Sequence, residues 1–159
     1  KECIIPDIVL FVNGLPLVVV ECKDANQVEA NPMYEAFRQL MRYTDQREGT
    51  KASGLREGEP RLFYTNQILV RTNGKQAEFG TITSTEEEYF YPWRDIYPER
   101  YRQYDPPLGA ERQQEQLIQG MLPRDTLLDI IRTSTLFMDV GTNGETVLGS
   151  SDWLVTVTL

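Results

Sequence analysis

Two acids and a lysine, Asp7, Glu21 and Lys23, border the most apolar segments near the start of the sequence. Ionised side chains are rarely buried in such surroundings unless they are paired or bind a metal ion. Two carboxylates that share a Mg²⁺ ion, with water completing the octahedron, suit chemistry on phosphates. A lysine beside the ion can position or deprotonate the attacking water, or offset the developing charge. These residue types therefore predict a metal-dependent hydrolytic site.

Two predicted strands must position these side chains. The runs Ile8–Val12 and Leu17–Val20 are apolar, and the Asn13-Gly14 pair between them is a strong signal for a β-hairpin. Because the runs are apolar on both faces, we expect the hairpin to lie in the middle of a covered sheet.

The length of the hairpin loop decides whether the two acids meet. A regular two-residue loop at Asn13-Gly14 would place Asp7 and Glu21 on opposite faces of the sheet. A three-residue loop with Gly14 in the left-handed region would place them diagonally on one face, about 7–8 Å apart. We therefore predict a glycine bulge at Gly14, or an equivalent bulge near Pro6, that aligns the acids.

One of the two cysteines, Cys22, lies between Glu21 and Lys23. Alternation along the strand predicts that its thiol points to the other face, so its backbone carbonyl is the expected extra metal ligand. Two cysteines form no disulfide framework, and we therefore expect a cytoplasmic location.

A helix is predicted after the hairpin. Asn31 is a favourable N-cap, and Pro32 suits the first helical position. Gln39 and Tyr43 are four residues apart and project side by side from this helix. They either support the site or are simply a solvated amide and a ring at the edge of the core.

Composition limits the chemistry that the chain can perform. The 159 residues contain no histidine, which excludes Ser-His-Asp and Cys-His catalysis and any metal site built on imidazole. The net charge of −8 argues against strong DNA binding by this chain alone, because phosphate contacts supply most non-specific affinity. The longest apolar stretch is far too short to span a membrane.

The rest of the chain contains further predicted elements. We expect strands over Leu62–Thr72 and Gln76–Thr83, joined by a second Asn-Gly turn. Two short amphipathic helices are expected over Glu111–Met121 and Asp125–Thr133, with Asp125 as N-cap. Residues 138–159 have no functional interpretation from sequence.

With Pro6 before Asp7, and with Glu21 and Lys23 separated by one residue, the segment resembles the PD-(D/E)xK nuclease signature. More narrowly, it is similar to the restriction (motor) subunit of type I restriction-modification enzymes. The resemblance covers roughly residues 4–137, and several motifs in the same order make an accident unlikely. The further segments that resemble this family are the Gln-x-x-x-Tyr motif Gln39–Tyr43, the strand pair Leu62–Thr83 and the helical lead-in to the motor, Glu115–Arg132.

The resemblance implies an α/β fold, with a restriction-endonuclease-like core of mixed β-sheet flanked by helices and a short helical segment after it. It divides the chain into a nuclease domain at 1–109, a lead-in to an ATPase motor at 110–137 and an unassigned tail at 138–159. It also implies an upstream helix with a further acidic residue, so a chain starting at Lys1 is expected to be a fragment.

For function, the resemblance implies Mg²⁺-dependent, non-specific cleavage of duplex DNA, with Mn²⁺ able to substitute. Asp7, Glu21 and the Cys22 carbonyl would bind the metal, and Lys23 would serve the attacking water. By the same resemblance, Gln39 and Tyr43 would support the site. ATP is expected only at a motor outside this chain, because no phosphate-cradling loop is present. The implied partners are duplex DNA and the modification and specificity subunits, with no membrane.

Three alternatives stay open at this stage. The first is a structure-selective nuclease, such as a junction resolvase, on the same core. The second is a catalytically silent scaffold that docks the motor. The third is a carboxylate-pair hydrolase such as a glycosidase, which Lys23 and the apolar strands support poorly.

Overall fold

The computed structural model describes residues 4–26, 31–44, 58–94, 112–139 and 153–157. Its centre is a five-stranded sheet in which the strands follow one another in chain order. The second and third strands are parallel and the other neighbours are antiparallel, so the sheet is mixed. The strands are β1 (Ile8–Val12), β2 (Leu15–Cys22), β3 (Ile68–Thr72), β4 (Ala77–Thr81) and β5 (Tyr91–Pro92).

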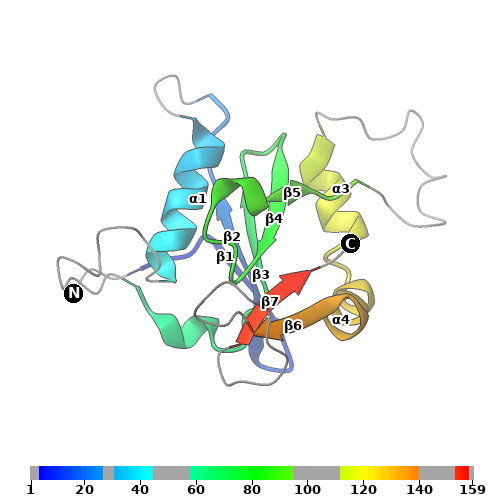
Figure 1. The fold of residues 1–159 in the computed structure, drawn as a ribbon. Coiled ribbons are helices and arrows are strands. Elements are labelled where there is room, and N and C mark those ends of the chain that lie inside the picture. Colours follow the sequence, from blue (N-terminus) through cyan, green and yellow to red (C-terminus); the bar gives the residue numbers. More distant parts are fainter. Residues whose placement is uncertain (1–3, 27–30, 45–57, 95–111, 140–152, 158–159) are drawn as a thin grey trace.

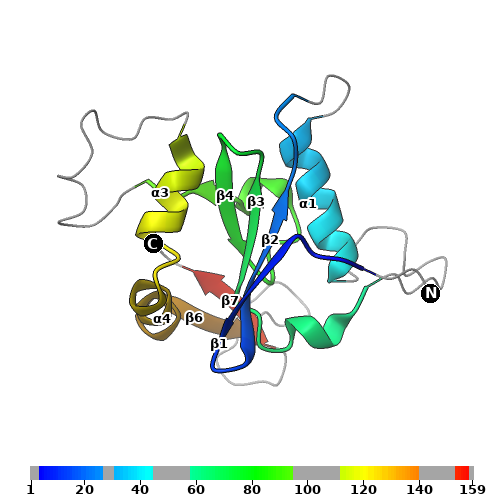
Figure 2. The same cartoon turned by 180° about the vertical axis from the view of Figure 1, so that it is seen from behind.

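Helices cover the sheet on both sides. Helix α1 (Pro32–Tyr43) lies on one side, and α3 (Gln113–Gly120) and α4 (Arg124–Thr133) lie on the other (Figure 1). The reverse view shows the same three layers (Figure 2). Short 3-10 turns, η1 (Pro60–Phe63) and η2 (Glu87–Tyr89), precede β3 and β5. The predicted class, an α/β fold with a mixed sheet flanked by helices, is confirmed.

The hairpin between β1 and β2 has a two-residue loop. Val12 pairs with Leu15, and Asn13 and Gly14 both have positive φ, 52° and 82°. Two successive positive values suit the type I′ turn, whose twist matches that of the strands. The predicted three-residue loop at Gly14 is therefore wrong.

A bulge elsewhere in the hairpin restores the alignment of the acids. Phe11 pairs with Pro16, but the preceding residue, Leu10, pairs with Val18, so Leu17 is an extra residue in β2. An extra residue exchanges the faces of all side chains beyond it. Beyond the bulge, Ile8 pairs with Val20. The next two residues toward the open end of the hairpin, Asp7 and Glu21, therefore lie across from each other.

Strand β1 lies at the edge of the described sheet, so the expectation that both hairpin strands are central is wrong for β1. Ile8 and Phe11 are 47% and 59% exposed. Strand β2 is central as expected, because β3 pairs with its other side, and its residues 17–21 are buried. Apolar residues on both faces therefore predicted a central position in the sheet correctly for β2 and incorrectly for β1.

Helix α1 begins as the sequence predicts. The Asn31 side chain accepts hydrogen bonds from the Met33 and Tyr34 amides, at 3.1 and 3.3 Å, and Pro32 follows the cap. The helix buries one apolar stripe against the sheet, which fixes which side chains face β2. This core contains Val19, Phe37, Leu40, Met41, Tyr43, Phe63, Leu69 and Phe90.

The opposite face of the sheet packs against α3 and α4. The two predicted helices are found, but Asp125 lies in the first turn of α4, and Pro123 occupies the N-cap position without a side-chain hydrogen bond. This core contains Leu17, Val18, Val20, Ile68, Val70, Ala77, Phe79, Leu117, Met121, Leu127 and Ile130.

The remaining predictions differ in detail. The strands of the second hairpin are shorter than expected, because Leu62 and Phe63 belong to η1. Part of the unassigned tail forms β7 (Trp153–Val157), which pairs with β6 (Thr135–Asp139) in a separate two-stranded sheet. None of the helices in the described parts of the chain combines the length and hydropathy that a membrane crossing needs.

Candidate functional site

Asp7 and Glu21, the two acids of the predicted site, lie at the outer end of the β1–β2 pair. Asp7 is exposed, and its Oδ2 accepts a hydrogen bond of 2.7 Å from the backbone amide of Cys22. The next amide, that of Lys23, donates at 2.8 Å to the carbonyl of Thr72, the last residue of β3. Backbone groups of successive strand residues point to alternate sides, so the Cys22 carbonyl opens toward Asp7.

Glu21 is the most buried acid in the described part of the chain, at 1% exposure. Its Oε1 forms an ion pair with Lys23 Nζ, and its Oε2 is buried without a hydrogen-bond partner. A buried charged oxygen without a partner is costly unless a cation or water satisfies it. This oxygen is therefore a position where a bound cation would be stabilising.

The surroundings of Glu21 affect its charge in opposite directions. Burial raises the pKa of the Glu21 carboxyl, and the hydrogen bond and charge of Lys23 lower it. The negative charge of Asp7 also raises the pKa, and the nearby Tyr43 hydroxyl lowers it. The net shift of the Glu21 pKa is upward, and burial is its largest cause.

A chain of hydrogen bonds connects Lys23 to α1 and back to β1. Lys23 Nζ donates to Gln39 Oε1 at 2.7 Å, and Gln39 Nε2 donates to the Tyr43 hydroxyl at 2.5 Å. The Tyr43 hydroxyl in turn donates to the Ile5 carbonyl at 3.0 Å. Burial raises the pKa of Tyr43 to about 12, so the phenol remains a proton donor at neutral pH. The structure thus brings all five predicted side chains into one cluster.

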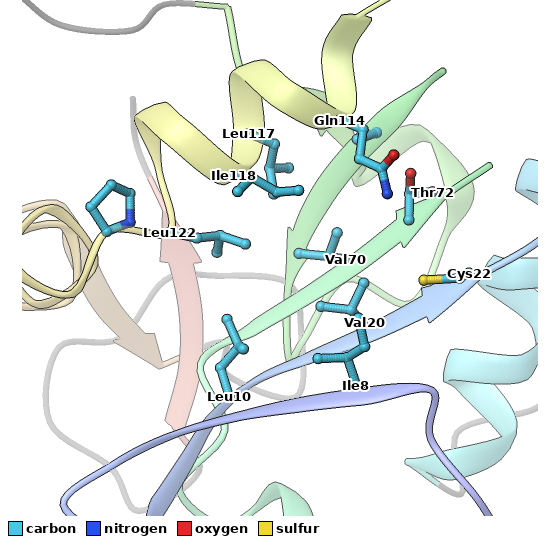
Figure 3. A pocket seen from close by; sticks show the side chains of 12 residues that line it. Ile8, Leu10, Val20, Cys22, Val70, Thr72, Gln114, Leu117, Ile118 and Leu122 are labelled. Carbon is cyan, nitrogen blue, oxygen red and sulfur yellow. The ribbon is translucent and has the colours of Figure 1, made fainter. Parts of the chain in front are cut away.

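Cys22 faces the opposite side of the sheet. Its thiol lies in a pocket of about 360 Å³ between the sheet and α3 (Figure 3). Burial raises the pKa of Cys22, and the charges of Asp7 and Glu21 raise it further, so the thiol stays protonated. The prediction that the thiol points away from the acids is confirmed. Other side chains around this pocket are Ile8, Leu10, Val20, Val70, Leu117 and Ile118.

A buried arginine, Arg71, lies beside the site and was not predicted from the sequence. Arg71 is 5% exposed and pairs in register with Glu21 on the neighbouring strand. Its guanidinium binds Glu78 and Glu87. The signal in the sequence was an arginine within the strand Ile68–Thr72, where a charge needs partners.

The donor atoms around Glu21 are of the kind that a hard divalent cation prefers. Oxygen ligands suit Mg²⁺, and Asp7, Glu21 and the Cys22 carbonyl are oxygen donors from adjacent positions. The buried Oε2 of Glu21 lacks a partner that such an ion would supply. Within the described ranges, no group of three or more His, Cys, Asp or Glu side chains could hold a metal ion. An ion held by these two carboxylates would need water to complete its coordination.

The fold and the site together define the class of this protein. A mixed sheet flanked by helices carries two carboxylates and a lysine at the outer end of the β1–β2 pair. The sheet and its flanking helices form an α/β restriction-endonuclease-like fold.

Comparison with known proteins shows the family. A family described as "Type I restriction enzyme R protein N terminus" matches residues 1–88, and the chain belongs to this family. The endonuclease subunit of the type I restriction enzyme HindI from Haemophilus influenzae is 33% identical over 133 residues, which cover 84% of this chain and 11% of that protein.

An archaeal protein is also similar. The putative type I restriction enzyme MjaVIIIP endonuclease subunit from Methanocaldococcus jannaschii is 27% identical over 137 residues, covering 86% of this chain and 11% of that protein. The chain therefore spans about a tenth of the length of these relatives.

Proposed function

We propose that this chain is the endonuclease domain of a type I restriction enzyme R subunit, and that it hydrolyses phosphodiester bonds of duplex DNA at a Mg²⁺-dependent PD-(D/E)xK site. The observation that carries the proposal is the buried Glu21 carboxylate, which has one oxygen on Lys23 and the other without a partner. Membership of the family and the position of Asp7 across the strand pair support it.

In this proposal each residue has a role that suits its position. Asp7, Glu21 and the Cys22 carbonyl would hold the ion, which supplies charge stabilisation and an acidified water when bound. Lys23 would orient the attacking water or offset charge on the phosphate. Its ammonium group is held at this position by Glu21 and Gln39, and a fixed position is what such a role needs.

Gln39 and Tyr43 are supporting residues in this proposal. They link Lys23, the residue after β2, to the carbonyl of Ile5, two residues before Asp7. Side chains fixed by such secondary contacts hold a catalytic geometry more tightly than side chains that end in solvent. These contacts favour the interpretation that Gln39 and Tyr43 support the site over that of a solvated amide and a ring at the edge of the core.

The net charge of −8 suggests that other parts of the assembly hold the DNA. An ATP-driven motor outside this chain, with modification and specificity subunits, would bring DNA to the site. The cut itself would then be independent of sequence, because target recognition would belong to those partners.

The proposal is tested by plasmid cleavage in an assembled restriction complex that carries Asp7→Asn or Glu21→Gln. Each change keeps the size of the side chain and removes one carboxylate charge. Cleavage is expected to be lost in both variants while ATP-driven translocation continues. Glu35→Gln, at an exposed acid of α1, is the matched control and should cleave normally. Normal cleavage by either site variant would refute the proposed site.

A catalytically silent docking scaffold is the second candidate. It is favoured by one observation, that the described residues bring together two acids rather than three. A scaffold would tolerate both substitutions in the cleavage assay and would bind no divalent cation through Asp7 and Glu21.

A further inference from the structure

A row of alternating charges crosses the sheet at the level of the site. Glu21 on β2 pairs with Arg71 on β3, and Arg71 pairs with Glu78 on β4. Residues paired directly across strands point to the same face. The three side chains therefore lie side by side on the face that α1 covers.

Arg71 makes no hydrogen bond to Glu21, although neighbouring strands are only about 4.8 Å apart. Its Nε and one terminal nitrogen bind Glu78 Oε2 at 2.8 and 2.5 Å. The other terminal nitrogen binds Glu87 Oε1 at 2.6 Å and the Met33 carbonyl at 3.4 Å. Among the described residues, the hydrogen-bond partners of this guanidinium lie on β4, η2 and α1, and none lies on β2.

The aromatic ring of Phe90 also restricts the guanidinium. The central carbon of the Arg71 guanidinium lies 5.1 Å from the centroid of the ring, within the range of a cation–π contact. The Arg71 side chain is 6% exposed, so it has little freedom to rearrange. Glu21 is in register with this buried cation on the neighbouring strand, yet its Oε2 has no hydrogen-bond partner.

We propose that Glu78 and Glu87 are positioning residues that hold Arg71 away from Glu21 and so leave the Glu21 carboxylate free to bind a divalent cation. A guanidinium that reached Glu21 would satisfy its second oxygen in a charge-assisted bond. Such a bond would compete directly with a metal ion for that oxygen. The effect on cation binding rests on the proposed function, in which Glu21 is a metal ligand.

The first test observes Arg71 directly and requires no metal. The NMR resonance of the Arg71 Nε–Hε group, assigned by its loss in Arg71→Lys, is compared with and without Glu21→Gln. In the otherwise wild-type chain, Glu21→Gln is expected to move this resonance only slightly. In a Glu78→Gln background the same change should move it several times farther, because the released guanidinium then binds Glu21.

A matched control removes a different carboxylate that accepts two hydrogen bonds from an arginine. Glu59 binds Arg61 through both oxygens, at 2.7 and 3.1 Å, on an exposed surface. Glu59→Gln should leave the Arg71 resonance insensitive to Glu21→Gln. If Glu21→Gln moves the Arg71 resonance equally in the wild-type and Glu78→Gln backgrounds, the proposal is overturned. Glu87→Gln, at a partly exposed acid, gives the same test if Glu78→Gln does not fold.

The second test measures the consequence for Mn²⁺ binding. Glu78→Gln is expected to weaken Mn²⁺ affinity about tenfold, as loss of a residue outside the ligand shell commonly does. Adding Arg71→Met should restore the affinity, because the competing cation is then absent. A loss that persists in the double variant would mean that Glu78 acts only by maintaining the fold, which overturns the competition.

The two tests separate this proposal from the proposed function. Mn²⁺ binding by the wild-type chain that does not depend on Asp7 and Glu21 would contradict the metal site. The resonance measurement would still decide whether Arg71 is held away from Glu21.

Discussion

The two faces of the central sheet are made by the same strands but have different chemistry. On the α1 face, β2 presents Glu21 beside Lys23, and β3 presents Arg71. On the face toward α3, the same strands present the apolar side chains Val20 and Val70, which line the pocket there (Figure 3). The charged groups around the site are thus confined to one face.

The contrast shows how strand alternation separates function from packing. One residue inserted into β2, Leu17, decides which side chains reach which face. The apolar face stabilises the strands through burial, which allows the other face to carry groups that are costly to bury.

The largest effect is expected from Lys23→Met, which acts on the charged face alone. Cleavage should fall by about 10²–10⁴-fold, the usual contribution of a positioned acid–base group, while Mn²⁺ binding is retained. The measurement is plasmid cleavage in an assembled complex, with exposed Lys75→Met as the control. Full cleavage by Lys23→Met would remove the lysine from the mechanism.

The same substitution on each face gives a direct comparison. Leu40 on α1 and Leu117 on α3 are 0% and 1% exposed, and truncation of either to alanine should cost about 2–5 kcal/mol of unfolding free energy. Only Leu40→Ala should also weaken Mn²⁺ binding, because Gln39 is its neighbour. Urea denaturation and Mn²⁺ titration at low temperature measure the two effects. Equal loss of Mn²⁺ affinity would mean that the faces are not independent.

The raised pKa of Glu21 predicts a pH dependence of stability in the metal-free chain. A carboxyl with a raised folded-state pKa stabilises the fold below its unfolded pKa of about 4.3 and loses this contribution as pH rises through the folded value. Glu21→Gln removes this titration. Its melting temperature should therefore improve relative to wild type between pH 4 and pH 7. A difference that is constant with pH would show that Glu21 is not strained by burial.

A smaller effect is expected at the edge of the charged face. Tyr43→Phe removes the hydrogen bond to the Ile5 carbonyl and should cost about 1 kcal/mol, measured by urea denaturation. Tyr34→Phe changes an exposed ring on the same helix and should cost almost nothing. Equal costs would indicate that the Tyr43 hydroxyl has no structural role.

Much of this architecture could be predicted from sequence, because local signals agreed with the fold. The Asn13-Gly14 pair predicted the hairpin, and Asn31 with Pro32 predicted the start of α1. Glu21 and Lys23 could be grouped because residues two apart on an extended chain point to the same face, and the family resemblance added Gln39 and Tyr43 to the site.

The bulge and the arginine contacts could not be predicted in detail. Leu17 is an ordinary apolar residue, and nothing in its type indicates that it interrupts the pairing of β1 with β2. Arg71, Glu78 and Glu87 come from different elements, so only the assembled sheet brings them together. Both features depend on tertiary pairing rather than on local preference.

The most direct test of the central claim is Mn²⁺ binding by this chain, compared with Asp7→Asn and Glu21→Gln. If the two carboxylates share one ion, both variants should lose binding while retaining the wild-type fold, as judged by circular dichroism. Equal Mn²⁺ binding by all three proteins, or binding by none, would contradict a shared two-carboxylate metal site in this chain.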